Sequence, residues 1–103
     1  MENKNFEIDW KILAVELDGK VDLETDGLKQ HGLKELNVIG ISKSVAEETA
    51  IKINTIAKMM IQGEEFDPSV CHCIDDSNGK TQFKFTLSST PFFGKDTWVL
   101  NFI

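Results

Sequence analysis

One stretch of helical periodicity lies in the middle of this chain, and strand-like alternation flanks it on both sides. The helical stretch has one apolar face, made by Ala46, Ala50, Ile53, Ala57, Met60 and Ile61. Ser42 or Ser44 can cap its start, Ser44 and Glu47 match a capping box, and Gly63 is a stop signal. We therefore predict one helix of about 18–20 residues, roughly 28 Å long, which is long enough to lie along a small sheet.

The flanking segments have the period of two that is typical of strands. They cover residues 5–17, 21–25, 35–41, 70–74, 82–88 and 98–103, with loops expected at 28–34 and 90–94. The order is therefore β-β-β-α-β-β-β. This order predicts a single α+β domain over residues 1–103, in which a mainly antiparallel sheet of five to six strands carries one long helix on one face.

Asp18 and Gly19 indicate a hairpin between the first two strands, and two registers are open. A three-residue loop with Gly19 in the left-handed conformation pairs Glu16 with Lys20, Val15 with Val21 and Leu13 with Leu23. A two-residue loop instead pairs Leu17 with Lys20 and Val15 with Asp22. We favour the three-residue loop because it matches apolar with apolar side chains, and a slip of one residue exchanges the two faces.

Composition excludes several classes of function. The 103 residues carry 17 acidic and 11 basic side chains, a net charge of −6, with no Lys/Arg cluster to neutralise the phosphates of a nucleic acid. No apolar run reaches the roughly 18–20 residues that a membrane span needs. The acidic N-terminal segment is unlike a signal peptide, so we expect a cytoplasmic protein. Cys71 and Cys73, one residue apart, do not make a disulfide framework.

One helix covers only one face of a sheet, yet several strands are apolar on both faces. In the last strand, Trp98, Leu100 and Phe102 point one way, and Val99 and Ile103 point the other. Exposed apolar surface beyond a few hundred Å² on a soluble monomer usually marks an interface. This pattern predicts a homodimer or an obligate protein partner.

Two groups of residues are candidates for binding that partner. Asp22, Glu24 and Asp26 alternate, so their carboxylates share one face of the second strand. We interpret them as a surface for a basic partner; the alternative is a solvated hairpin whose charges discourage edge aggregation. Phe92 and Phe93, in the expected loop, either anchor a partner or fold back over the core.

The segment Cys71-His72-Cys73 is a weak candidate for a metal site. In a strand the two cysteines share one face and His72 takes the other, so the three side chains do not converge on one ion. We interpret them as two small buried thiols and a cross-strand histidine. A two-residue turn at Asn78-Gly79 pairs His72 with Phe85, whereas a three-residue loop pairs Cys71 with Phe85, and hydrophobic matching favours the first.

The remaining polar motifs predict no catalytic residue, metal or cofactor. The segment 75–79 resembles a calcium loop, but Ile74 and Phe85 would stand where oxygen ligands are needed. His31, near Asp26 and Glu35 in sequence, can be a general base, yet a histidine in a polar turn is more often structural. No nucleophile motif, phosphate loop or H-E-x-x-H helix accompanies it.

Part of the chain resembles a known family. The run Thr25-Asp26-Gly27-Leu28, then Gly32, then Glu35-Leu36-Asn37-Val38-Ile39-Gly40 and the helix, over residues 22–65, is similar to small bacterial domains of unknown function that share a T-x-G-L…G…E-L-x-V-x-G pattern. Asp26 and Lys34 stand where the pattern has an apolar residue and a proline. The resemblance implies a strand–loop–strand–helix unit and carries no established activity.

These observations favour a non-catalytic protein-interaction module. Its most concrete form is a small acidic bacterial partner protein of the immunity type, which masks a basic toxin or enzyme. The alternative is a small-molecule-binding domain or minor enzyme, with a pocket between sheet and helix or at a dimer seam. In that case His31, His72 and the Phe92–Phe93 loop are the residues to test.

Overall fold

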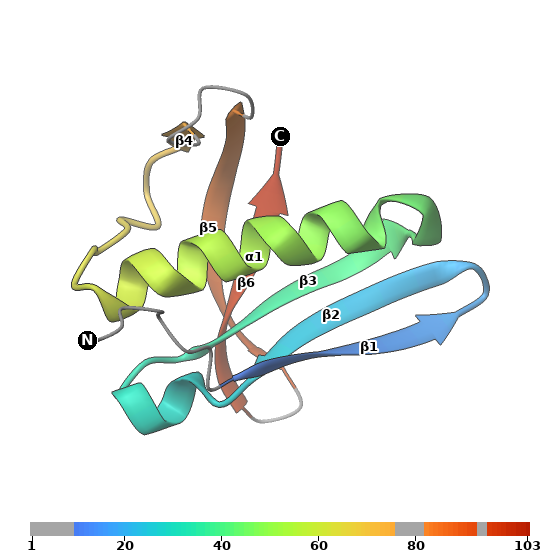
Figure 1. Ribbon diagram of the computed structural model, residues 1–103, viewed down its shortest axis with the longest axis horizontal. Coiled ribbons are helices and arrows are strands. Elements are labelled where there is room, and N and C mark those ends of the chain that lie inside the picture. The colour runs from blue at the N-terminus through green and yellow to red at the C-terminus, as the bar shows by residue number, and fades with distance from the viewer. Residues whose placement is uncertain (1–9, 76–81, 93–94) are drawn as a thin grey trace, which may run out of the picture.

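The computed structural model describes residues 10–75, 82–92 and 95–103 (Figure 1). The predicted order of six strands and one long helix is confirmed. The elements are β1 (Lys11–Leu17), β2 (Lys20–Asp26), the short 3₁₀ helix η1 (Leu28–His31), β3 (Glu35–Ser42), the 3₁₀ turn η2 (Lys43–Val45), α1 (Ala46–Ile61), β4 (His72–Asp75), β5 (Gln82–Phe92) and β6 (Lys95–Phe102).

The six strands form one sheet in the order β1-β2-β3-β6-β5-β4. Each set of three consecutive strands is an antiparallel meander, and the two sets join where β3 runs parallel to β6, with Leu36 opposite Trp98. Helix α1 lies across one face, in front of β5 and β6 in Figure 1. The opposite face carries no helix among the described residues. The prediction of a mainly antiparallel α+β domain is therefore confirmed.

The core lies between α1 and the sheet face that it covers. Ile53 and Ala57 of the predicted apolar helix face are fully buried, and Ile56 and Thr49, which the prediction missed, are buried with them. Ahead of β1, the Trp10 Nε1–H donates to Asn54 Oδ1 on α1 over 2.9 Å. The buried apolar residues are Trp10, Val21, Leu23, Leu28, Leu36, Val38, Ile53, Ile56, Ala57, Ile74, Phe83, Phe85, Leu87 and Leu100.

The favoured register of the β1–β2 hairpin is wrong. Leu17 pairs with Lys20 and Val15 with Asp22, as in the two-residue loop. Asp18 and Gly19 both have left-handed backbones, with φ of 54° and 78°, so both take the central positions of a type I′ turn, whose twist matches the strands. Aspartate tolerates this conformation better than most residues. The correction places Leu13, Val15 and Leu17 of β1 on the same face as the carboxylates of β2.

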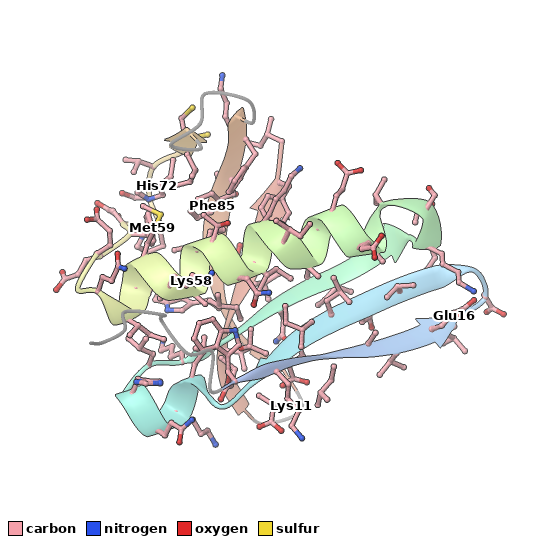
Figure 2. All side chains as sticks on the ribbon, viewed as in Figure 1. Lys11, Glu16, Lys58, Met59, His72 and Phe85 are labelled. Carbon is pink, nitrogen blue, oxygen red and sulfur yellow. The ribbon has the colours of Figure 1, made fainter. Side chains whose placement is uncertain are left out.

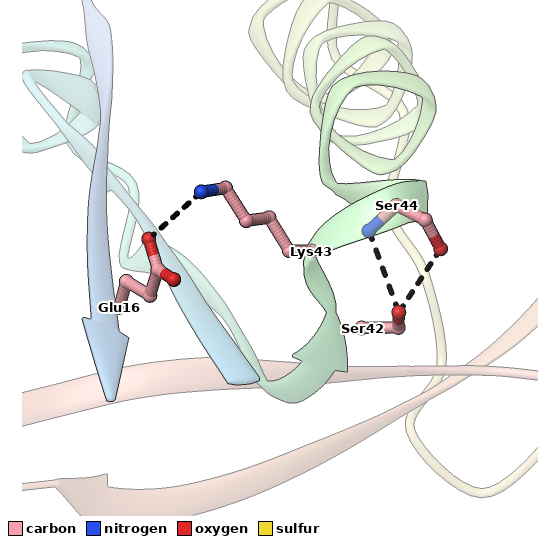
Figure 3. A network of polar contacts seen from close by, with 4 residues as sticks. All are labelled: Glu16, Ser42, Lys43 and Ser44. Atoms are coloured by element: carbon pink, nitrogen blue, oxygen red, sulfur yellow. Dashed lines mark hydrogen bonds and ion pairs between the residues drawn. The ribbon is translucent and has the colours of Figure 1, made fainter. Parts of the chain in front are cut away.

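The capping box at the helix start is also wrong. The side chain of Ser42 accepts from the backbone N–H of Ser44 over 3.4 Å, and this contact caps η2 and not α1 (Figure 3). Ser44 lies within the 3₁₀ turn, so α1 begins only at Ala46. The N-cap residue of α1 is Val45, whose side chain makes no capping hydrogen bond. The helix therefore has 16 residues, fewer than predicted.

Two loop predictions change as well. The segment 28–34 contains η1, and the loop expected at 90–94 is wrong for its first three residues, because the β5–β6 ladder continues to the pair Phe92–Lys95. Pro91 pairs with Asp96 in this ladder, and a proline is compatible with this position near a strand end. Residues 5–9 of the first predicted strand, most of the second hairpin turn and residues 93–94 lie outside the described residues.

An exposed ion pair connects the β1–β2 hairpin to the start of the helical segment. The Lys43 ammonium lies 3.4 Å from the Glu16 carboxylate, and the side chains are 70% and 50% exposed (Figure 3). Exposed pairs of this kind contribute about 0–1 kcal/mol. We expect Lys43→Ala to change the free energy of unfolding by less than about 0.5 kcal/mol. Urea denaturation at low and high salt measures this, and a loss above about 1.5 kcal/mol would contradict it.

Candidate functional site

The uncovered face of β1, β2 and β3 combines exposed apolar side chains with carboxylates. Leu13, Val15 and Ile39 are 45%, 64% and 44% exposed. Asp22 and Glu24 are half-buried among them. We call this surface the β1–β3 patch and define it as Leu13, Val15, Asp22, Glu24, Asn37 and Ile39.

The corrected hairpin register assembles the patch. It makes Val15 the cross-strand partner of Asp22, and Leu13 that of Glu24. These side chains point to the same side of the sheet because directly opposed residues do so. Together with Leu23 and the rest of the patch, they line a shallow hollow of about 290 Å³. The predicted carboxylate face thus has an apolar floor, which the favoured register would have placed on the opposite side of the sheet.

Asp22 also has a structural role within the patch. The pairing of β2 with β3 is irregular between Val21 and Leu23, which indicates a β-bulge beside Asp22. There Gly40 takes a φ of 71°, and its backbone N–H donates to Asp22 Oδ1 over 2.8 Å. A bulge leaves a backbone group without its ladder partner, and the carboxylate satisfies it. Asp22 therefore lies at a defined position in the patch.

The third predicted carboxylate borders a second, smaller hollow. Asp26 is exposed at the end of β2 and lines this hollow of about 140 Å³ together with Lys29 and Glu35. Leu13 and Glu24 line both hollows. The structure thus brings the three predicted carboxylates to one continuous surface.

Glu35, which the sequence analysis did not select, lies at the inner side of this smaller hollow. Its side chain is only 6% exposed. The Thr25 hydroxyl donates to Oε1 over 2.7 Å, and the backbone N–H groups of Gly27, Leu28 and Lys29 donate to the two carboxylate oxygens over 3.1–3.2 Å. The carboxylate therefore accepts four hydrogen bonds and fixes the start of η1 against β3.

Burial and hydrogen bonding act in opposite directions on this carboxyl group. Burial by itself raises the pKa of Glu35, because it disfavours the charged form. The hydrogen bonds from Thr25 and from the three backbone N–H groups favour the charged form and outweigh burial, so the pKa lies below its ordinary value of 4.5. Glu35 is therefore an ion at neutral pH, and its role is to hold the loop.

Several residues of the Thr25–Gly40 pattern meet at Glu35. Thr25, Gly27 and Leu28 bind its carboxylate, and the backbone N–H of Leu36 donates to the Thr25 hydroxyl over 2.9 Å. Leu28 and Leu36 are fully buried. In this chain the pattern therefore describes a structural hydrogen-bond cluster. The sequence signal for this cluster is a threonine and a glutamate that flank a turn.

The Cys71-His72-Cys73 segment has a structural environment. Both thiols are exposed, so the prediction of buried thiols is wrong. The register that pairs His72 with Phe85 is confirmed. The imidazole Nε2 lies 2.8 Å from the carbonyl oxygen of Asp67, and the ring contacts Phe85 at a centroid distance of 5.4 Å, over the C-terminal half of α1 (Figure 2). His72 is thus a cross-strand histidine, as interpreted.

The other candidate residues lie away from the patch or beyond the described part of the chain. His31 is exposed at the end of η1. Phe92 ends β5, but its side chain and all of Phe93 lie outside what the structure describes. Among the described side chains, no group of three or more His, Cys, Asp or Glu residues is placed to hold a metal ion.

The β1–β3 patch is the main structural basis for proposing a function. In residues 10–75, 82–92 and 95–103, no helix combines the length and the apolar character that crossing a bilayer requires. No family model, no curated protein and no solved structure matches this chain.

Proposed function

We propose that the protein is a non-catalytic interaction module of the immunity type, which binds a basic toxin or enzyme through the β1–β3 patch. One observation carries the proposal: the exposed apolar side chains of β1 are paired directly with carboxylates of β2, as Val15 with Asp22 and Leu13 with Glu24. Because β2 lies between β1 and β3, these carboxylates have exposed apolar side chains on both sides, so a partner can pair its cationic groups with them while it covers the apolar surface.

The charge of the chain supports a basic partner. The net charge is −6, and Asp22, Glu24 and Asp26 concentrate negative charge at the two adjoining hollows. Such a field accelerates the encounter with a positively charged protein and disfavours acidic ones. Screening limits this attraction to about 8 Å at physiological salt, so binding should weaken as salt increases.

The hollow itself favours a protein over a small molecule. It lies on the uncovered sheet face and not between the sheet and the helix, which is one of the two places where the small-molecule alternative predicts a pocket. Its volume of about 290 Å³ is at the lower end of ligand pockets, which span roughly 300–1,000 Å³. Its apolar walls, Leu13, Val15 and Ile39, are themselves about half exposed. A partner that covers the whole patch buries these side chains better than a ligand in the hollow.

Charge reversal at the patch tests the proposal. We expect Glu24→Lys/Asp26→Lys to raise the Kd for a basic partner at least about tenfold, by replacing attraction with repulsion. Asp22 is retained because it satisfies the Gly40 N–H. The partner is the basic protein that co-purifies with the tagged chain from its own host, identified by native mass spectrometry and then titrated by calorimetry.

The matched control is Glu64→Lys/Glu65→Lys, which changes the net charge equally. Glu64 and Glu65 are exposed after α1, away from the residues that line the two hollows. The control should keep the wild-type Kd within about threefold, because remote exposed charges are screened. Equal weakening by both variants would show that only net charge matters. Unchanged binding by Glu24→Lys/Asp26→Lys would reject the patch as the site.

A further inference from the structure

The two edges of the sheet are built differently. The sheet order places β1 at one edge and β4 at the other. Strand β4 has four residues, whereas β1 has seven, six of which are exposed. Proteins usually shorten or charge their edge strands, because an open edge pairs with other chains. Within the described part of the chain, β2 is the only strand that pairs with β1.

The hairpin register defines which backbone groups of β1 face outward. In a two-residue hairpin the closing pair, here Leu17 and Lys20, is hydrogen-bonded, and such pairs alternate along the ladder. Leu13 and Val15 therefore bond to β2, while Ala14 and Glu16 direct their N–H and C=O groups away from β2. These outward groups can accept another strand.

From Leu13 to Leu17 the side chains of β1 on the uncovered face carry no charge, and Lys11 lies at the start of the strand. Leu13, Val15 and Leu17 are 45%, 64% and 73% exposed, and all three lie on the uncovered face. Glu16, the acidic residue of β1, lies on the other face, where its carboxylate forms an ion pair with Lys43 at 3.4 Å (Figure 3). An edge strand with three exposed apolar side chains on one face is suited to pairing with another chain.

We propose that β1 pairs antiparallel with β1 of a second copy, so that two sheets join into one. A two-fold axis at Val15 places Val15 opposite its own copy and Leu13 opposite Leu17 of the second copy, which matches all three exposed apolar residues. The same axis places Ala14 opposite Glu16 of the second copy, so that their outward backbone groups pair. An axis at Glu16 would instead oppose two carboxylates, which is unfavourable.

The pairing also enlarges the binding surface beyond the single patch. Leu17 of the second copy lies beside Leu13 and extends the apolar floor of the hollow, so the partner copy contributes to the site. The carboxylates of the two patches remain three strand spacings apart, about 14 Å, which exceeds the Debye length of about 8 Å at physiological salt. On the other face the two Glu16 side chains become diagonal neighbours, about 7–8 Å apart, and each has Lys43 of its own copy beside it. The like charges of the two copies therefore permit the dimer at physiological salt and oppose it at low salt.

Removing one outward N–H group tests the pairing directly. Ala14→Pro deletes a donor that faces away from β2, and proline is tolerated on an edge strand in this orientation. In the dimer it removes two symmetric hydrogen bonds, and we expect the dimer Kd to rise about ten- to a hundredfold. Ala14→Thr retains the N–H and is the matched control. Analytical ultracentrifugation of the full chain measures the Kd, and the wild type should reach about twice 11.6 kDa.

Val15→Lys is a second variant, which brings two ammonium groups face to face at the two-fold axis and should also dissociate the dimer. A wild type that stays monomeric at high concentration and physiological salt overturns the proposal. A dimer that Val15→Lys dissociates and Ala14→Pro leaves intact also overturns it, because the copies would then pack through their faces. Circular dichroism verifies the fold of each variant. Lower salt should weaken the dimer and strengthen binding of a basic protein, which separates the two interactions.

Discussion

Replacing Glu35 with glutamine is expected to lower the free energy of unfolding by about 2–4 kcal/mol at neutral pH. The carboxylate is 6% exposed and accepts one hydroxyl and three backbone hydrogen bonds. A glutamine has one acceptor oxygen, and its amide nitrogen would face backbone N–H donors. At least one buried donor therefore loses its partner, which costs more than the average hydrogen bond contributes.

The effect of Glu35→Gln should depend on pH in a defined direction. The pKa of Glu35 in the folded protein lies below its ordinary value of 4.5 because four hydrogen bonds outweigh burial. The unfolded chain therefore binds the proton more readily, and stability decreases as the pH falls. The stabilisation is complete above pH 4.5 and is lost as the pH falls through the lowered pKa. Urea denaturation between pH 3 and 7 should show the wild type and the variant converging at the acidic end.

Glu64→Gln is the control for this experiment. Glu64 is exposed after α1, so its replacement should stay within about 0.5 kcal/mol of the wild type. A Glu35→Gln variant whose deficit is the same at every pH would show that packing, and not ionisation, causes the loss. A deficit below about 0.5 kcal/mol at pH 7 would show that the carboxylate does not hold the loop.

The second large effect is expected from Phe85→Ala, which should cost about 3–5 kcal/mol. Phe85, labelled in Figure 2, is fully buried in the same core as Ile53 and Ile56 of α1. Its ring contacts Phe66, His72 and Phe102 at centroid distances of 5.3–6.2 Å. Removing the ring leaves a cavity between β4, β6 and the segment after α1, and the several elements that surround it cannot all collapse into it.

Two variants control for this measurement. Phe85→Leu fills part of the volume and should cost less than half as much. Ile51→Ala removes an apolar side chain that is 63% exposed on α1 and should change stability by less than about 0.5 kcal/mol. Thermal and urea denaturation should rank the three variants in this order. A Phe85→Ala cost similar to that of Ile51→Ala would contradict the packing described.

The features that could be predicted from the sequence were local patterns. The helix at 46–61 was predicted from apolar residues spaced at 3.6, and β3 was predicted from a period of two. The pairing of His72 with Phe85 was predicted from a two-residue turn and hydrophobic matching across the hairpin. Even here the helix start was wrong, because a 3₁₀ turn and an α-helical turn differ in the tightness of their hydrogen bonds, and the residue spacing does not separate the two.

Only part of the candidate site could be predicted from the sequence. The shared face of Asp22, Glu24 and Asp26 was predicted from alternation, but their apolar neighbours were not. Matching apolar with apolar residues favoured the wrong hairpin register, because it assumed that the apolar residues of β1 lie in the core. The left-handed backbone of Asp18 decided otherwise, and with it the face on which Leu13 and Val15 lie.

The sequence by itself determined the order of the elements, the acidic charge and the alternation of the carboxylates, because these depend on neighbours within a few residues. The tertiary structure decided the parallel contact of β3 with β6, the burial of Glu35 and the position of β1 at one edge of the sheet. These features depend on which segments distant in sequence lie side by side. Only the complete sheet decides which face the helix covers, and therefore which side chains remain for a partner.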